Sequence, residues 1–344
     1  MKIAIIFPRL SGPYGGEKIL IKVTDELVRL GHTVTLYVYE YNALCASHLN
    51  PHITVVHSRA FKFGRHNLDT FFAYLAMPWL ANKILCDYEL ILGMTWQAAF
   101  ALWWLRKVRR CFRQTPLVYH CFEPPRFIYD LQTVTGNSLL ARLTAFFIKR
   151  IDRTSVRAAD VIISISDYIQ KQVKKVYNRD SVKIYPGVEI ERFQKYTRRE
   201  AREILNIPLD REVFLSISKL HKRKRLDRAL EIFQKRRKDQ NSVFYIAGQG
   251  PEEGNLKYLV KQMHLEKVVK FIGVVLGEKT VQYMAACDYF IFTALNEPFG
   301  IAPLEAKVAG AKVIPRERPY PILNWQESAG KMHRVFLKLV TSRS

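Results

Sequence analysis

Two glutamates in the last sixth of the chain stand in a segment that could bind a ligand with several hydroxyl groups. Glu297 and Glu305 are separated by seven residues, and Phe299 and Gly300 lie between them. Carboxylates accept charge-assisted hydrogen bonds from vicinal hydroxyls, and loop amides around Phe299 and Gly300 can donate to a hydroxyl or a phosphate. Because sugars and ribose both carry such hydroxyl pairs, this spacing predicts a site for a sugar or a nucleotide.

A basic segment in the second half could neutralise a phosphate. Lys219 and Lys224 follow the apolar run 213–217 and precede a helical pattern. Cations at the carboxyl end of a strand and the start of a helix suit a diphosphate leaving group, whose developing charge they would neutralise. For Lys222 and Arg223, a solvated basic surface is the favoured interpretation.

A glycine-rich turn, residues 11–17, follows the first apolar run of the chain. Gly15 and Gly16 would allow backbone amides to approach an anion at the positive end of the next helix. The spacing is not Gly-x-Gly-x-x-Gly, so a phosphate or sugar contact is favoured over a dinucleotide fingerprint. A tight turn that needs only the backbone freedom of glycine stays open as an alternative.

The elements that must position these residues alternate regularly. Short apolar runs and helical patterns follow one another along the whole chain, which indicates α/β architecture with parallel sheets covered by helices. The predicted strands are residues 3–7, 34–39, 53–56, 90–92, 117–119, 161–165, 182–184, 213–217, 243–247, 268–272, 289–293 and 312–314. The predicted helices include residues 20–30, which end at Gly31, and residues 226–237, 252–264, 279–287 and 303–308.

The chain is predicted to form two domains. Its 344 residues exceed what one hydrophobic core usually organises, and Pro186-Gly187 precedes a polar stretch, residues 189–202, that is typical of a joint. The predicted domains are residues 1–188 and 189–344, each a Rossmann-like sheet. Since such sheets bind ligands at the carboxyl ends of their strands, two facing domains predict a cleft between them.

The charge of the chain favours phosphate-rich partners. It has 54 Lys and Arg against 31 Asp and Glu, a formal net charge of +23. No aromatic strand motif, zinc spacing or recognition helix supports a nucleic-acid partner, so none is expected. Some predicted helices are rich in basic and aromatic residues. Such helices are equally compatible with peripheral contact with an anionic membrane and with ordinary packing on the sheet. Their residues are Trp103, Trp104, Arg106, Lys107, Arg109, Arg110, Arg113, Phe146, Phe147, Lys149 and Arg150.

The cysteines predict a reducing environment. Cys45, Cys86, Cys111, Cys121 and Cys287 are odd in number and never spaced Cys-x-x-Cys, so neither a disulfide frame nor a zinc site is expected. The first apolar run is too short for a signal peptide, and the most apolar stretch, 91–105, is too short to span a membrane. A cytoplasmic protein is the expectation, and peripheral contact with the cytosolic face of a membrane stays open as an alternative to a protein without such contact.

Several ordered motifs together resemble glycosyltransferase family 4, the retaining nucleotide-sugar transferases of GT-B fold, and within it the mannosyltransferases. The motifs are Gly15-Gly16-Glu17, Glu123-Pro124-Pro125-Arg126, Ser164-Ile165-Ser166, Tyr185-Pro186-Gly187-Val188, residues 219–227, Ala247-Gly248-Gln249-Gly250-Pro251, Phe271-Ile272-Gly273, and residues 297–305 with Ala306 and Gly310. The resemblance covers nearly the whole chain.

The resemblance implies a role for each site residue. Gly15 and Gly16 would contact donor and acceptor, Lys219 and Lys224 the donor diphosphate, Phe299 and Gly300 the donor, Glu297 the donor sugar, Glu305 the nucleotide ribose and Arg126 the acceptor or sugar. The implied reaction moves a hexose, with retention, to a lipid-linked or surface-glycan acceptor. GDP-mannose is the favoured donor and a UDP-sugar the alternative. No cofactor is implied, and no metal is expected because the chain has no Asp-x-Asp pair.

Three departures from the family pattern bear on activity. Lys219 replaces the usual Arg, and Phe122 replaces the usual histidine before the Glu-Pro dipeptide. His120, two residues away, would point to the same side of the strand and is the catalytic candidate beside Glu297, although a structural role for this histidine is the favoured interpretation. After Ile314 no Gly-Gly loop, glutamate or helix returning to the first domain is recognised, so a shortened C-terminal domain is predicted. A catalytically impaired or non-catalytic relative that binds nucleotide sugar and a GT-B sugar epimerase stay open as alternatives.

Overall fold

The computed structural model describes residues 1–10, 15–43, 47–58, 72, 74–129, 139–237, 241–315 and 320–343. They form two compact units, which are described separately. Unit 1 comprises Met1–Gly187 and Trp325–Ser344, and unit 2 comprises Val188–Asn324. The turn residues 11–14 and Cys45 lie outside the described residues.

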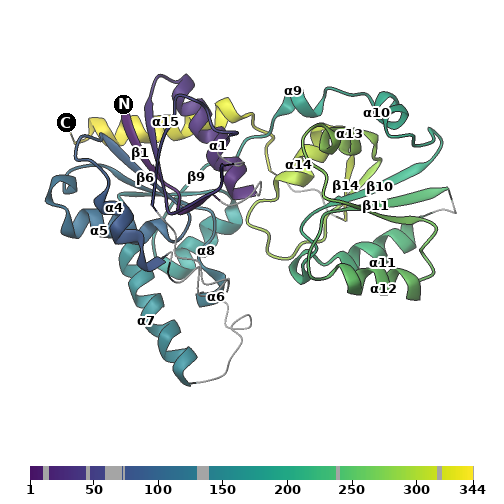
Figure 1. Cartoon of the computed structure of the whole chain (residues 1–344), viewed down its shortest axis with the longest axis horizontal. Helices are drawn as coiled ribbons and strands as arrows, with labels where there is room; N and C mark the ends of the chain where they lie inside the picture. The colour runs from purple at the N-terminus through teal and green to yellow at the C-terminus, as the bar shows by residue number, and fades with distance from the viewer. Residues whose placement is uncertain are drawn as a thin grey trace. The chain divides into compact units, whose positions relative to one another are not determined.

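Unit 1 is built on a parallel sheet whose strand order is β5-β3-β1-β6-β7-β8-β9. The strands are β1 Lys2–Ile6, β3 Thr33–Val38, β5 Thr54–His57, β6 Leu90–Met94, β7 Leu117–Cys121, β8 Val161–Ser164 and β9 Val182–Lys183, and a separate pair is formed by β2 Arg9–Leu10 and β4 Glu40–Tyr41. The helices are α1 Gly15–Arg29, α4 Met77–Asn82, α5 Ala98–Val108, η1 Arg110–Phe112, α6 Arg126–Tyr129, α7 Leu139–Val156, α8 Asp167–Tyr177 and α15 Trp325–Thr341. Helices α1 and α15 cover one face of this sheet, and α5, α7 and α8 lie on the other (Figure 1).

Unit 2 repeats the same architecture with a smaller parallel sheet of order β12-β11-β10-β13-β14. Its strands are β10 Glu212–Ile217, β11 Ser242–Ala247, β12 Val269–Gly273, β13 Tyr289–Ile291 and β14 Lys312–Ile314. Its helices are α9 Ile190–Phe193, α10 Arg198–Ile204, η2 Lys222–Lys224, α11 Leu226–Arg236, α12 Glu253–Gln262, α13 Glu278–Ala286 and α14 Ile301–Val308. Helices α11 and α12 pack on one face of the sheet and α13 and α14 on the other (Figure 1).

The pattern-based prediction of the strands is confirmed. Every predicted strand is present with ends within two residues, because buried parallel strands read as short apolar runs. Gly31 follows α1 with a φ of +80°, the left-handed conformation that glycine adopts without a steric penalty. The two-residue strands β2 and β4 were not predicted, since no sequence period can show in so short a segment.

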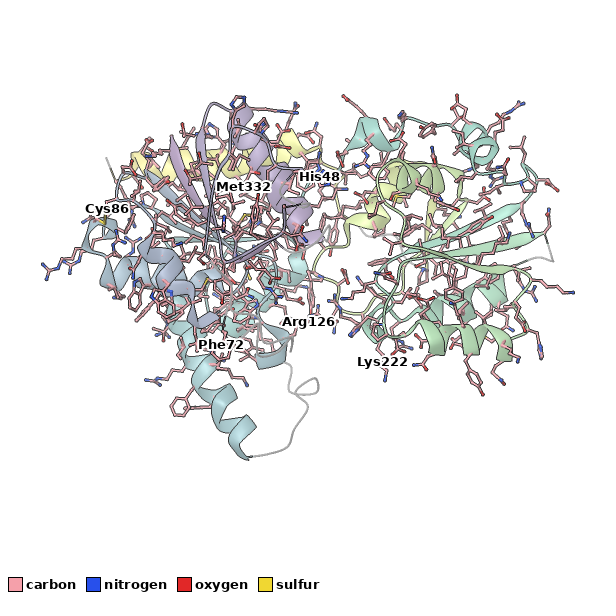
Figure 2. All side chains as sticks on the ribbon, viewed as in Figure 1. His48, Phe72, Cys86, Arg126, Lys222 and Met332 are labelled. Carbon is pink, nitrogen blue, oxygen red and sulfur yellow. A yellow bond between two sulfur atoms is a disulfide. The ribbon has the colours of Figure 1, made fainter. Side chains whose placement is uncertain are left out.

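The C-terminal segment corrects the prediction that no helix returns to the first domain. Helix α15 belongs to unit 1, where it packs against α1, so residues 325–344 do not belong to the second unit as predicted. Trp325, Ala329, Met332 and Phe336 are buried at helical spacing on one face of α15, and Met332, labelled in Figure 2, is 1% exposed. This amphipathic spacing was visible in the sequence and was missed.

Polar contacts also hold α15 to unit 1. The Ser328 hydroxyl donates to the Tyr185 carbonyl at 2.7 Å, and the imidazoles of His333 and His32 share a hydrogen bond of 2.9 Å. Burial, followed by the nearby N-terminal ammonium and His333, lowers the pKa of His32 to about 4. Both contacts join segments that lie far apart in the chain.

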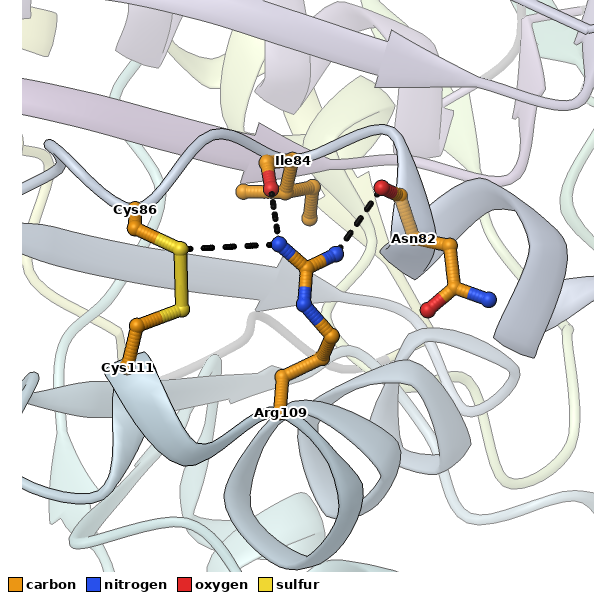
Figure 3. Close-up of a disulfide and its surroundings, with 5 residues drawn as sticks. All are labelled: Asn82, Ile84, Cys86, Arg109 and Cys111. Carbon is orange, nitrogen blue, oxygen red and sulfur yellow. Dashed lines mark hydrogen bonds between the residues drawn. A yellow bond between two sulfur atoms is a disulfide. The ribbon is translucent and has the colours of Figure 1, made fainter.

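A disulfide between Cys86 and Cys111 corrects the prediction of a chain without disulfides. Their Cα atoms are 5.7 Å apart, although 25 residues separate them in sequence. Arg109 secures the same corner, since its guanidinium donates to the Asn82 and Ile84 carbonyls at 2.8 and 3.3 Å (Figure 3). Cys121 and Cys287 are buried and free. The spacing of Cys86 and Cys111 in the sequence does not predict this disulfide, because the fold and not the local sequence brings the two segments together.

Candidate functional site

The predicted phosphate-binding residues of unit 2 lie at the carboxyl end of its sheet. Lys219 follows β10 and is exposed, Lys224 lies in η2, and Glu297 follows β13. Strands β10 and β13 are paired neighbours, so their carboxyl-end loops meet. The structure thereby brings together Lys224 and Glu297, which are 73 residues apart.

Lys224 and Glu297 form a partly buried ion pair. The Lys224 ammonium donates to Glu297 Oε2 at 2.9 Å, and their side chains are 16% and 15% exposed. Arg223 Nη2 is 3.9 Å from the same carboxylate oxygen. A pair this sheltered is screened less by salt than a surface pair, so its charges act strongly on a ligand that replaces either partner.

Backbone contacts clamp the two loops that carry this pair. The Thr293 hydroxyl lies 2.9 and 2.8 Å from the carbonyls of Lys224 and Arg225, and the Leu295 amide donates to the Arg223 carbonyl at 3.2 Å. The loops are therefore positioned before any ligand arrives, which is a requirement for electrostatic stabilisation of a leaving group. Thr293 was not singled out in the sequence, where a lone threonine after a strand carries no signal.

The loop that follows β11 packs closely against the loop that follows β10, which carries Lys219. A Cβ atom added at Gly248 would lie 1.9 Å from the Ser218 carbonyl oxygen, and one added at Gly250 would lie 2.2 Å from the Leu220 carbonyl oxygen. Only glycine permits this approach of the two backbones. The Gly248-Gln249-Gly250 motif therefore acts on the site through packing.

Helix α14 carries the remaining predicted residues of unit 2. Gly300 precedes it with a φ of +81°, and the Phe299 ring, 2% exposed, stacks on Tyr320 with centroids 5.1 Å apart. Glu305 lies on the first turns of α14 and is 6% exposed. A buried carboxylate near the start of a helix is well suited to accept hydrogen bonds from a diol.

In unit 1 the structure brings Gly16, His120 and Phe122 together. A Cβ atom at Gly16 would lie 3.5 Å from the Phe122 ring, and the Phe122 and His120 rings meet edge to face at 4.9 Å. Gly15 starts α1 in an exposed position with open space around it. Phe122 is thus a half-buried ring that faces both His120 and Gly16.

His120 is more deeply buried than a catalytic side chain would ordinarily be. It is 2% exposed, and neither ring nitrogen has a hydrogen-bond partner within the described residues. Burial lowers the pKa of His120 to about 3, so the ring is neutral at neutral pH. Unpartnered buried nitrogens are costly, and such sites call for an explanation.

Arg126 begins α6 and is paired with Glu123 of the same Glu-Pro-Pro-Arg motif. Helix α6 is anchored by Tyr129, whose hydroxyl donates to Asp152 Oδ2 of α7 at 2.8 Å. Asp152 is fully buried, and burial raises its pKa to about 7. The motif therefore rests on a rigid internal contact.

The predicted membrane residues divide into two groups. On and after α5, Trp104 donates to Asn82 at 3.0 Å, and Arg106 donates to the Phe112 carbonyl and to Asp160 at 3.0 and 2.8 Å. On α7, by contrast, Phe146 and Phe147 are each 60% exposed. Within the described residues, no helix combines the length and apolar character that crossing a membrane requires.

Comparisons with known proteins match both halves of the chain to described families. Residues 13–192 match the family described as Glycosyltransferase Family 4, and residues 197–320 match the family described as Glycosyl transferases group 1. The chain is 27% identical over 189 residues to alpha-monoglucosyldiacylglycerol synthase of Streptococcus pneumoniae, an alignment that covers 53% of this chain and 41% of the synthase. It is 24% identical over 358 residues to alpha-1,3/1,6-mannosyltransferase ALG2 of Dictyostelium discoideum, covering 91% of this chain and 81% of the relative.

Solved structures show the same fold at low identity. Anabaena HepE in complex with UDP and glucose superposes with a TM-score of 0.68 at 21% identity, covering 100% of this chain and 93% of that one. WaaG, a glycosyltransferase involved in lipopolysaccharide biosynthesis, superposes with a TM-score of 0.66 at 16% identity, covering 98% and 90%. These neighbours share the predicted architecture of two Rossmann-like domains.

Proposed function

Since the chain belongs to glycosyltransferase family 4 and has the GT-B fold, we propose that it transfers mannose from GDP-mannose to a lipid-linked or surface-glycan acceptor. Glycosyl transfer from a nucleotide sugar follows from the family. The choice of mannose is supported by the Dictyostelium mannosyltransferase, which aligns over most of both chains. A UDP-sugar is the alternative donor, since Anabaena HepE was solved in complex with UDP-glucose.

The Lys224–Glu297 pair is the observation that carries this proposal. In the free protein the ammonium and the carboxylate neutralise each other at 2.9 Å. A donor diphosphate brings negative charge that competes for Lys224 and, with Lys219, neutralises the leaving group. Glu297 is then free to accept hydrogen bonds from the sugar hydroxyls, while Glu305 accepts them from the ribose.

The proposed reaction needs no covalent enzyme intermediate. The bond from the anomeric carbon to the diphosphate oxygen breaks, and the acceptor oxygen bonds to that carbon on the same face, through an oxocarbenium-like transition state. The departing diphosphate accepts the proton of the acceptor hydroxyl. Lysines and backbone amides are proposed to supply the stabilisation that a metal ion gives elsewhere, and Gly15 and Gly16 stay proposed donor contacts.

The test is a calorimetric titration with GDP-mannose, UDP-glucose and UDP-N-acetylglucosamine. We expect one donor to bind wild type and to bind Glu305→Gln at least tenfold more weakly. Glu203→Gln, a change at an exposed glutamate of α10, should leave the affinity unchanged. Binding of no donor, or equal loss in both variants, would contradict the proposal. Proton NMR of the product, with and without EDTA, then tests retention and metal independence.

A non-catalytic nucleotide-sugar-binding protein is the second candidate, and the position of His120 favours it. The imidazole is buried behind Phe122, so it does not reach an acceptor in this conformation. This candidate predicts tight donor binding without transfer or hydrolysis. Interconversion of the donor sugar without any acceptor would instead indicate the epimerase alternative.

Peripheral contact with an anionic membrane is proposed for the exposed face of α7. Phe146 and Phe147 are exposed, and Arg150, about one turn further along α7, is an exposed cation, a combination suited to the lipid headgroup region. We expect flotation with vesicles containing phosphatidylglycerol and loss of flotation in the double variant Phe146→Ser, Phe147→Ser. Equal flotation with neutral phosphatidylcholine vesicles would refute an anionic surface as the partner.

A further inference from the structure

The helix that carries Arg126 is too short to keep its own shape. Helix α6 is a single turn, Arg126–Tyr129, that follows two buried prolines. The Ile128 and Tyr129 amides both donate to the Pro125 carbonyl, at 3.0 and 3.2 Å. A single turn fixes several backbone dihedral angles in return for few hydrogen bonds, so it is unstable on its own. Contacts from other elements must therefore hold α6, and with it Arg126, in place.

These contacts converge on Tyr129, the last residue of α6. Its hydroxyl donates to Asp152 Oδ2 at 2.8 Å, and its ring meets the Tyr177 ring of α8 edge to face, with centroids 6.1 Å apart. The Lys149 ammonium and the Arg153 guanidinium lie 5.8 and 5.7 Å from the centroid of the Tyr129 ring. Figure 1 shows α6 beside α7, the longer helix that supplies three of these four partners.

The spacing of the partners on α7 explains why they meet one ring. Lys149, Asp152 and Arg153 are three and four residues apart, so they lie on the same face of the helix. The two cations are attracted to the electron-rich ring, while the carboxyl group accepts from the hydroxyl at its edge. Tyr129 is therefore held by its ring and by its hydroxyl at once.

The hydrogen bond from Tyr129 to Asp152 is costly to lose. Asp152 is fully buried, and within the described residues its other oxygen, Oδ1, has no hydrogen-bond partner. If Tyr129 moved away, a buried acceptor would lose its partner without gaining water, which favours the docked position of α6. The bond is available in either charge state of Asp152, since a protonated carboxyl group keeps an acceptor oxygen.

We propose that Tyr129 and Asp152 are positioning residues, which hold Arg126 in place for the transfer reaction without touching a substrate themselves. The proposal rests on the proposed function, in which Arg126 contacts the acceptor or the transferred sugar. A displacement of about 1 Å at a group that orients a substrate can cost a rate factor of about a hundred. The Tyr129–Asp152 contact prevents such a displacement of α6.

Hydrogen exchange of the Ile128 and Tyr129 amides tests whether this contact holds α6. We expect exchange about tenfold faster in Tyr129→Phe, which loses the hydroxyl and keeps the ring. Asp152→Asn keeps an acceptor oxygen and should exchange at the wild-type rate. Tyr196→Phe is the matched control, because it removes a hydroxyl that donates to Glu278 at 2.7 Å in unit 2, and it should also exchange as wild type. Equal rates in wild type and Tyr129→Phe would overturn the proposal.

Release of GDP from GDP-mannose, with water in place of the acceptor, tests whether Tyr129 acts through Arg126. We expect Tyr129→Phe to lower kcat by about fivefold and to leave the KM for the donor unchanged. Arg126→Gln should also lower kcat, and adding Tyr129→Phe to it should cause no further loss, because the two changes remove one effect. Losses that multiply in the double variant would show that Tyr129 does not act through Arg126 and would overturn the proposal.

The two measurements separate this inference from the proposed function. Faster exchange of α6 in Tyr129→Phe with an unchanged rate of GDP release would refute the positioning role while leaving the proposed function intact. If wild type releases no GDP, the proposed function fails, whereas faster exchange in Tyr129→Phe would still establish that the Tyr129–Asp152 contact holds α6 and Arg126.

Discussion

Replacing the buried histidine beside Phe122 should stabilise the protein and reveal whether that histidine serves the reaction. His120 keeps two ring nitrogens without partners in the described part of the chain, and it is 2% exposed. A neutral imidazole has one donor and one acceptor, and leaving such a group unsatisfied costs about 1–3 kcal/mol. His120→Leu fills a similar volume with apolar atoms. We expect a net gain of about 1–2 kcal/mol, or roughly 2–8 °C in melting temperature for a domain of this size.

The gain should depend on pH in a defined direction. The pKa of His120 falls from 6.5 to about 3 on folding, so the unfolded chain binds the extra proton between these values. Wild type therefore loses stability as pH falls from 6.5 towards 3, whereas His120→Leu lacks this loss. The difference between the two should widen by about 1.4 kcal/mol per pH unit below 6.5.

Calorimetry at pH 7.5 and pH 5.5 measures both effects, and Tyr119→Phe is the matched control. Tyr119 lies on the same strand, is fully buried, and its hydroxyl also lacks a partner within the described residues. Its removal should stabilise the protein equally at both pH values and leave transfer unchanged. A lower melting temperature for His120→Leu at both pH values would refute the reasoning, because it would show that the imidazole is satisfied. Stabilisation with loss of transfer would identify His120 as functional.

Further predictions concern stability in each unit. Burial raises the pKa of Asp152 from 3.8 to about 7, so the folded protein loses stability as the pH rises from 4 through 7; Asp152→Asn should gain about 4 kcal/mol over wild type at pH 8 and nothing at pH 4, by thermal unfolding. Reduction of the Cys86–Cys111 disulfide should cost about 2–4 kcal/mol in wild type, whereas dithiothreitol should leave the double serine variant unchanged. Gly250→Ala places a Cβ 2.2 Å from a carbonyl oxygen and should both destabilise the protein by about 1–3 kcal/mol and weaken donor binding, whereas Gly254→Ala, with open space at Cβ, should do neither in the same assays.

Local sequence patterns predicted most of the architecture because they reflect the conformational preferences and burial of neighbouring residues. Apolar runs of strand length, helical spacing and the glycine after α1 are properties of neighbouring residues, and each reappears in the structure at its predicted place. The same logic was available for α15, where Trp325, Ala329, Met332 and Phe336 follow the helical period. The short length of each apolar step in this helix, set among charged residues, makes its period less apparent than that of the strands.

The candidate site was only partly visible in the sequence. Residue types at strand ends pointed to Lys224, Glu297 and Glu305, since cations and carboxylates there suit a nucleotide sugar. That Lys224 and Glu297 touch could not be predicted, because 73 residues separate them. The burial of His120 was equally hidden, since spacing gives the side of a strand but not what covers it.

The sequence by itself determined the fold class, the order of the strands along the chain, the basic charge and the family to which the chain belongs. These properties depend on residue type and short spacing, which can be read from the sequence without knowledge of contacts between distant segments. Only the tertiary structure decided the Cys86–Cys111 bond, the return of α15 to unit 1 and the ion pair between Lys224 and Glu297. Each joins segments that are remote in sequence, and their meeting is set by strand pairing and helix packing over the whole sheet.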